Sequence, residues 1–356
     1  MKTSHALLSS LALAAPLLLS MDPRADDVTF APVEGSSVTK TFTLSQEFEE
    51  GALTISRGGK ELSIETTGSS TRSITIADTY TKMDGSKPVQ LMRAFKDGAT
   101  DIATESALFS KGAEQKFEAS GEGDSRLNDL TIAFAWDAEQ GEYLKSYDDE
   151  SEGEDAWLVD LNENMDLRGF LPSGEVAIGD EWEAETSVLL SIFAPGGNLQ
   201  WDLKMVDDGR NGGVDPAIFS ELGSMLEGSD IEGEIQCKYA GPQEVEGAEY
   251  LAIEVTILVD ALTDLTEDAE ASMDGSDLPE GVEFEIGDMA MELHLEGKGL
   301  LLWDAQAGHL HSFSYAGDTA LNINRVLYIS SAGKVIENST QIDVSGTVSV
   351  EVTTEP

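Results

Sequence analysis

Polar and apolar residues alternate along most of the chain, which is the pattern of strands that bury one face. Between Val38 and Leu44, Lys40 and the apolar residues alternate with three threonines. Residues 53–57 and 62–65 are two further alternating stretches, and the glycine pair between them predicts a hairpin. We therefore expect a mainly β (α+β) protein with long antiparallel curved sheets or half-barrels and two or three short helices.

Helical spacing of apolar residues occurs in two places. Asp215 and Pro216 suit the cap and first position of a helix, and the apolar residues that follow predict a helix near 216–227. A second, short amphipathic helix is expected within 156–167. In contrast, residues 182–193 and 198–206 are predicted as two strands of a hairpin.

Turn-forming residues divide the chain near its middle. The stretch Phe170–Trp182 contains Pro172, Gly174 and a Gly-Asp pair, which predicts a junction between two β-rich halves. A Trp-Asp-Ala-x-x-Gly turn occurs once in each half, at 136–141 and 303–308, either because the halves are related or because both are good hairpin turns. The expected organisation is a signal peptide at 1–20, a flexible lead-in at 21–36, an N-terminal β-rich half at 37–168, the junction at 169–182 and a C-terminal β-rich half at 183–356.

The first twenty residues resemble an export signal. They carry one lysine and no acid, and the run from Ala6 to Leu19 is almost wholly apolar or small. That run is shorter than the roughly 20 residues of a membrane span. We expect an exported protein, periplasmic or extracellular, that does not span a membrane.

The charge of the chain is strongly acidic. There are 68 acidic and 21 basic residues, for a formal net charge of −47. Nucleic-acid phosphates and anionic lipid headgroups are repelled by such a surface, so no nucleic-acid partner is expected. Loosely bound cations are the natural partners, although a solvated surface without any specific ligand has the same composition.

Motifs that carry chemistry are missing from the sequence. It contains no Gly-x-Ser-x-Gly elbow and no phosphate-binding glycine loop, and its single cysteine, Cys237, has no histidine nearby in the sequence. The acidic stretch 148–160 lacks the ligand spacing of a calcium-binding loop. We expect no enzyme activity, no catalytic residue, no cofactor and no specific metal site.

One group of side chains, in the strand expected after the second Trp-Asp-Ala-x-x-Gly turn, is a candidate ligand-facing surface. By simple alternation, His309, His311, Phe313 and Tyr315 share one face of a strand. If that face lines a cavity, these side chains contact a ligand; if it meets the core, they are packing residues. The histidine spacing does not by itself establish a zinc site with Asp304.

Two short motifs resemble those of a known group of proteins. Leu171-Pro172 is followed by Val-x-x-Gly-Asp-x-Trp at 176–182, and the turn at 303–308 precedes a strand. The chain is similar in this respect to uncharacterised secreted bacterial β-rich proteins with a Gly-Asp-x-Trp segment. The resemblance implies a curved sheet or half-barrel, similar in general to periplasmic lipoprotein carriers, and it assigns no activity and no functional residue.

The expected function is binding rather than catalysis. The first hypothesis is an exported acidic carrier that holds an apolar or amphiphilic ligand, such as a lipid, on a concave sheet. It rests mainly on the analogy of fold. The alternative is a cell-surface structural or interaction protein with a cation-binding acidic exterior.

Overall fold

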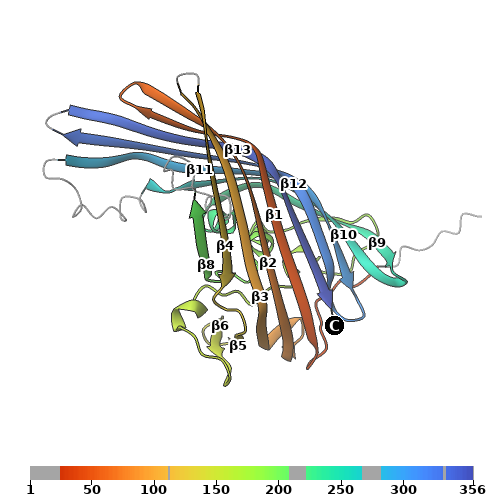
Figure 1. The fold of residues 1–356 in the computed structure, drawn as a ribbon. Coiled ribbons are helices and arrows are strands. Elements are labelled where there is room, and N and C mark those ends of the chain that lie inside the picture. Colours follow the sequence, from red (N-terminus) through yellow and green to blue (C-terminus); the bar gives the residue numbers. More distant parts are fainter. Residues whose placement is uncertain (1–24, 111–112, 208–221, 267–281, 332–333, 356) are drawn as a thin grey trace, which may run out of the picture.

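The protein is mainly β, as the sequence predicts, and it forms one large antiparallel sheet of 13 strands (Figure 1). The structure is a computed structural model that describes residues 25–110, 113–207, 222–266, 282–331 and 334–355. The signal peptide predicted at 1–20 lies outside these residues. The strands are β1 Ser37–Arg57, β2 Lys60–Asp84, β3 Lys87–Ser110, β4 Ala113–Ser125, β5 Thr131–Asp137, β6 Glu142–Tyr147, β7 Glu181–Glu183, β8 Trp201–Asp207, β9 Asp230–Val245, β10 Ala248–Asp264, β11 Val282–Asp304, β12 His309–Ser331 and β13 Lys334–Glu355.

The strands of both predicted halves join in this single sheet. Its order is β6-β5-β3-β2-β1-β13-β12-β11-β10-β9-β7, and β4 pairs with β3 and with β8. Strands β1 and β13 pair from Thr39↔Glu355 to Arg57↔Asn338 near the centre of the sheet. Strands β1, β2, β3, β5 and β6 follow on one side of this pair and β12, β11, β10, β9 and β7 on the other, while the pairing of β4 with β8 also joins the two groups. The division into a 37–168 half and a 183–356 half, and a relationship between the halves, stay predictions.

Short hairpins connect the long strands. The predicted hairpin of residues 53–65 is confirmed, with Arg57 opposite Lys60 across Gly58 and Gly59. Both glycines have positive φ, which a two-residue turn needs if its twist is to match the strands.

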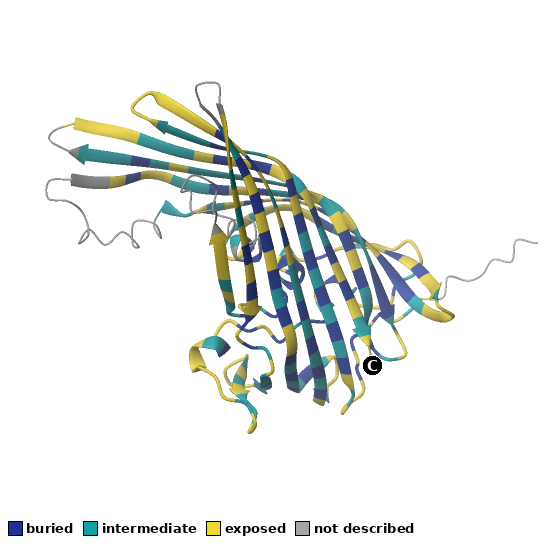
Figure 2. Ribbon diagram, viewed as in Figure 1, coloured by how far each residue is buried: buried dark blue, intermediate teal, exposed yellow. Residues whose placement is uncertain are grey.

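Alternating side chains give the sheet two different faces (Figure 2). In β1 the buried residues Val38, Phe42 and Phe48 alternate with exposed or half-buried ones. We call the face with the buried side chains the inner face and the opposite face the outer face. Burial of the apolar set on the inner face fixes the register, because a slip of one residue would expose all of it.

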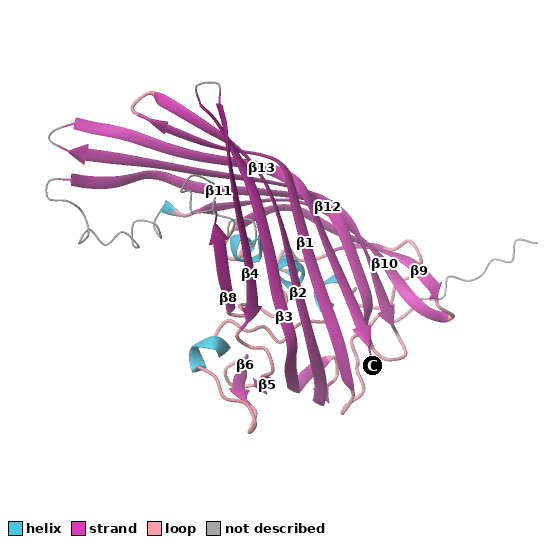
Figure 3. Cartoon of the chain, in the orientation of Figure 1, coloured by secondary structure: helices cyan, strands magenta, loops and turns pink. Residues whose placement is uncertain are grey.

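Residues 155–200, which we call the central segment, pack against the inner face beneath β1, β2, β3 and β12. This segment contains the 3₁₀ turns η1 Asp155–Leu158 and η2 Arg168–Phe170, strand β7 and helix α1 Val188–Phe193. In the view of Figure 3, short helical elements lie behind the long strands, and another lies beside β5 and β6. Leu161, Met165 and Phe170 are buried there, so the central segment contributes to the core.

Two predictions for the central segment are wrong. The helix expected within 156–167 is limited to η1, because the side chains of Asn162 and Asn164 accept hydrogen bonds from the backbone N–H groups two residues ahead and favour turns instead. The strand expected at 182–193 is limited to β7, and Val188–Phe193 is helix α1. Within the helix predicted near 216–227, Leu222–Leu226 is helix α2, and residues 216–221 lie outside the described residues.

The lead-in, which the sequence predicts to be flexible, is packed from Asp26 onward. Asp26 pairs with Val176 in an isolated bridge and accepts a hydrogen bond from the Tyr239 hydroxyl at 2.6 Å. Val28 and Phe30 are buried. No helix among the described residues is long and apolar enough to cross a membrane.

The two Trp-Asp-Ala-x-x-Gly segments are equivalent turns, as the sequence predicts. In each, the aspartate side chain accepts two backbone N–H bonds and the glycine N–H donates to the aspartate carbonyl. Gly141 and Gly308 both have positive φ. They differ in surroundings: a Cβ at Gly141 would meet nothing within 4 Å, whereas one at Gly308 would lie 2.2 Å from the Ala31 carbonyl oxygen.

These glycines provide a matched pair of substitutions. Gly141→Ala should lower the free energy of unfolding by about 1–2 kcal/mol, the cost of a left-handed alanine. Gly308→Ala should cost at least about 1 kcal/mol more, since the new methyl group must also displace the lead-in. Denaturant unfolding measures both values, and equal losses would contradict the packed lead-in.

Candidate functional site

Beneath the sheet lies a cluster of charged side chains that is fully buried. The Lys40 ammonium is 2.9 Å from Asp78 and 2.6 Å from Asp166, and Arg93 donates two hydrogen bonds to Asp78. The Tyr80 hydroxyl donates to Asp166 at 2.7 Å. Three adjacent strands, β1, β2 and β3, supply Lys40, Asp78, Tyr80 and Arg93, and the central segment supplies Asp166.

The same cluster attaches the central segment to the sheet at further points. The Arg93 guanidinium donates to the carbonyl oxygens of Asn162 and Glu163, both at 2.7 Å. Arg168 in turn pairs with the Glu163 carboxylate. Lys40, Arg93 and Arg168 thus face Asp78, Asp166 and Glu163, and of these six side chains only Arg168 is partly exposed.

The pKa values of the cluster follow from burial and pairing. Burial raises the pKa of the Asp78 carboxyl, but the charges of Arg93 and Lys40 outweigh that effect and hold the pKa below its usual value. Burial, together with the charge of Asp166, raises the pKa of Tyr80. For Glu163, burial outweighs the pairing with Arg168 and raises the pKa. The paired charges hold strands β1, β2 and β3 to the central segment, which indicates a structural role for the cluster.

Two of the four predicted ligand-facing residues are core residues. Phe313 stacks on Phe170 of the central segment with ring centroids 5.5 Å apart, and Tyr315 meets Phe193 edge-on at 6.0 Å. Both Phe313 and Tyr315 are buried. They therefore pack against the chain itself.

The two histidines lie apart from that core contact. A β-bulge between Leu302 and Trp303 interrupts the pairing of β11 with β12, and simple alternation fails there. His311 is half-buried and stacks on Tyr250 with centroids 3.7 Å apart. His309 is half-buried, and its Nδ1 lies 2.7 Å from the Leu310 carbonyl oxygen. The four side chains do not form one surface.

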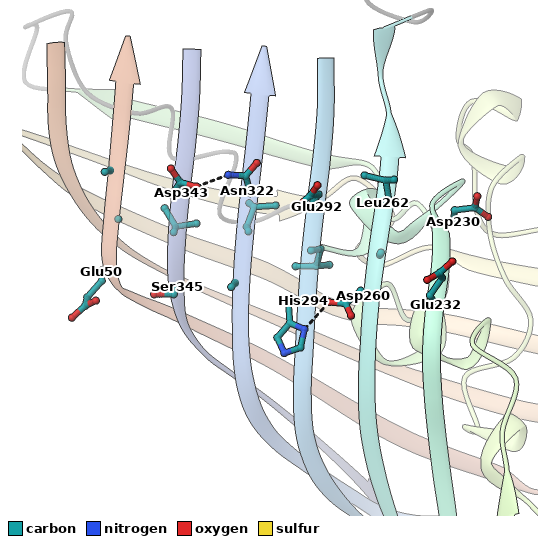
Figure 4. A pocket seen from close by; sticks show the side chains of 17 residues that line it. Glu50, Asp230, Glu232, Asp260, Leu262, Glu292, His294, Asn322, Asp343 and Ser345 are labelled. Atoms are coloured by element: carbon teal, nitrogen blue, oxygen red, sulfur yellow. Dashed lines mark hydrogen bonds and ion pairs between the residues drawn. The ribbon is translucent and has the colours of Figure 1, made fainter. Parts of the chain in front are cut away.

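A groove on the outer face is the site that the sequence reading missed (Figure 4). Its volume is about 850 Å³, and strands β9, β10, β11, β12, β13 and β1 all contribute to it. On β10, β11, β12 and β13 the residues labelled in Figure 4 alternate with the buried Ala261, Leu293, Leu321 and Val344, which places the labelled side chains on the outer face. The small side chains of Ala52, Ala320 and Ser345 leave the space open.

Two rows of side chains cross the strands in this groove. The first row is Asp230, Leu262, Glu292, Asn322 and Asp343, which are direct partners in the register. The second row is Glu232, Asp260, His294, Ala320, Ser345 and Glu50. Adjacent strands lie about 4.8 Å apart, so the three carboxylates of the first row recur about every 10 Å.

The charge in the groove is of one sign. Six carboxylates line it, from Glu50, Asp230, Glu232, Asp260, Glu292 and Asp343, and no lysine or arginine does. Two of them have side-chain partners in the groove: His294 Nδ1 is 2.7 Å from Asp260, and Asn322 donates to Asp343. A smaller hollow of about 450 Å³ shares Glu50 and Gly51 with the groove and is lined by five further glutamates, so the acidic surface continues across β1.

The groove does not resemble a metal centre. Among the described residues, no group of three or more histidine, cysteine, aspartate or glutamate side chains converges in a way that holds a metal ion. Its carboxylates are spread along rows, and the adjacent Leu262 is half-exposed. This arrangement can attract an extended cationic molecule by charge and contact it through an apolar side chain.

Comparison with known proteins adds no relative. No protein-family model matches the chain, and neither a curated protein nor a solved structure does. The likeness to secreted β-rich proteins with a Gly-Asp-x-Trp segment therefore stays an expectation.

The buried cluster predicts a large effect from one substitution. Asp78→Asn leaves Lys40 and Arg93 without their shared carboxylate and should cost about 3–5 kcal/mol of stability at neutral pH. Because the folded pKa of Asp78 is lowered, its contribution is present above the unfolded pKa of about 3.9 and is lost as the pH falls through the folded value. The difference between the wild type and the variant should therefore narrow below about pH 4.

Denaturant unfolding from neutral to acidic pH tests this expectation. The control is Asp101→Asn, an exposed position on β3, which should change stability by less than about 0.5 kcal/mol. A loss for Asp78→Asn as small as that of the control would show that the cluster does not hold the fold.

Proposed function

We propose that this protein is a non-enzymatic binding protein that works through its outer face, where the groove receives a cationic partner. The observation that supports the proposal is the groove itself, in which six carboxylates and no basic side chain face an open space of about 850 Å³. Potentials of opposite sign on two partners favour encounter and correct orientation. This is the interaction-protein hypothesis drawn from the sequence, now assigned to particular residues.

The net charge of the whole chain favours the same kind of partner. At −47, the molecule attracts cations from a distance and repels nucleic acid. Loosely bound cations on the acidic exterior, and an exported periplasmic or extracellular location, belong to the same proposal. Since salt screens exposed charges over about 10 Å at 0.1 M, binding through this surface should weaken as salt rises.

The carrier hypothesis needs a different face. An apolar or amphiphilic ligand such as a lipid would lie on the concave inner face, where the central segment already packs Phe170 and Phe193 against β12. Such a ligand would have to displace these side chains. We therefore rank the outer face first.

The proposal predicts charge-dependent binding at a defined place. Octalysine should bind the protein at about 50 mM salt, and binding should weaken at higher salt. The triple variant Asp230→Asn, Glu292→Gln, Asp343→Asn removes the first-row carboxylates and should weaken binding by about tenfold or more. Fluorescence anisotropy of labelled octalysine measures both effects.

A control variant separates the groove from the net charge. The triple variant Asp149→Asn, Glu150→Gln, Glu152→Gln removes the same number of charges from an exposed loop. Its affinity for octalysine should stay within about twofold of the wild-type value. Equal weakening in the two variants would mean that octalysine responds to overall charge alone, and absence of binding at low salt would refute the proposed function.

A further inference from the structure

We infer that the groove receives a basic amphipathic α-helix that lies across the strands, with cationic side chains one heptad apart. This inference rests on the proposed function and specifies the partner. All residues that line the groove belong to the described part of the chain.

The length of the groove favours a macromolecular segment. It crosses six neighbouring strands, from Asp230 and Glu232 on β9 to Glu50 on β1. At about 4.8 Å per strand, the rows extend for about 20–24 Å. An α-helix of about 15 residues has the same length.

The spacing of the carboxylates favours the helical form. Asp230, Glu292 and Asp343 lie on every second strand and so about 10 Å apart. On a helix, residues seven apart share a face and are about 10.5 Å apart, because the rise is 1.5 Å per residue. Alternate residues of an extended peptide are only about 6.6–6.8 Å apart and would fall out of step with the carboxylates.

The apolar side chain in the first row supplies a second point of contact. Leu262 is 50% exposed and stands midway between Asp230 and Glu292. If two basic residues of a helix, seven positions apart, lie on those two carboxylates, the helix residue three or four positions after the first basic residue lies over Leu262. An apolar residue at that position covers the leucine, whereas Asn322 holds the equivalent place between Glu292 and Asp343 and suits a polar residue.

The predicted partner therefore has a definite pattern: a basic residue, an apolar residue three or four positions later, and further basic residues seven and fourteen positions after the first. Helices that bind in grooves are recognised through anchors of this spacing. Pairing of the basic residues with the first-row carboxylates orients the helix across the strands. The apolar contact with Leu262 adds binding free energy that salt does not screen.

The experiment compares two 15-residue helical peptides of the same composition. In the first, lysines stand at positions 1, 8 and 15 and leucine at position 4, with alanine and glutamine elsewhere. In the second, the same residues are permuted so that the lysines fall at positions 1, 3 and 5. At physiological salt the heptad peptide should bind at least about fivefold more tightly, as measured by isothermal titration calorimetry.

Two leucines of the same strand provide the matched substitution. Leu262→Ser should weaken binding of the heptad peptide by about fivefold, since the apolar contact of this half-exposed leucine with the peptide is lost. Leu258→Ser is the control, because Leu258 is 44% exposed on β10 but does not line the groove, and it should leave the affinity unchanged. Both side chains are exposed, so thermal unfolding should be nearly the same for the two variants.

Different failures have different meanings. If both peptides bind equally and the first-row triple variant weakens both, the groove is a cationic site but the helix inference is overturned. The helix inference is also overturned if spermidine binds as tightly as the heptad peptide and Leu262→Ser has no effect on peptide binding, because the partner is then a small polyamine. If neither peptide nor octalysine binds at low salt, the proposed function fails as well.

Discussion

The buried ion pairs of Lys40 and Arg93 with Asp78 and Asp166 determine which face of this sheet is available. Charges at this depth are tolerated only when they are paired and hydrogen-bonded, and the partners come from three strands and from the central segment. The central segment is therefore positioned by specific pairs as well as by apolar packing. It occupies the inner face beneath β1, β2, β3 and β12, and the groove lies on the opposite, outer face.

The outer face is shaped by the sheet that the core holds in register. The rows of side chains arise because each strand keeps its alternation, so the positions of Asp260, Glu292 and Asp343 depend on burial of the residues next to them, Ala261, Leu293 and Val344. Small residues at 52, 320 and 345 leave the groove open, and the six carboxylates around them make it acidic. A surface with six carboxylates and no lysine or arginine attracts a cationic partner.

Local patterns in the sequence predicted local structure well. The β class, the hairpin at residues 53–65 and the turns at 136–141 and 303–308 all follow from alternation and turn-forming residues. Lys40 stands at a position that alternation assigns to the buried face, which indicates that an acidic partner lies in the core. The sequence does not show that the partners are Asp78 and Asp166. The pairing of β1 with β13 and the rows of the groove bring together residues that are far apart in the chain. The bulge at Leu302 and Trp303 changes the face on which the histidines lie. Neither the long-range pairing nor the bulge can be predicted from the alternation of polar and apolar residues.

The central claim is that the central segment belongs to the core and occupies the inner face beneath β1, β2, β3 and β12, which is why the proposed function is assigned to the outer face. Hydrogen exchange of the backbone amides at 161–170, compared with those of β1, β2 and β3, tests it most directly. The account predicts that both sets exchange slowly and together, through global unfolding, because the segment is held by buried pairs. Exchange of 161–170 within seconds while the strands stay protected would contradict it, since the inner face would then open in the native protein.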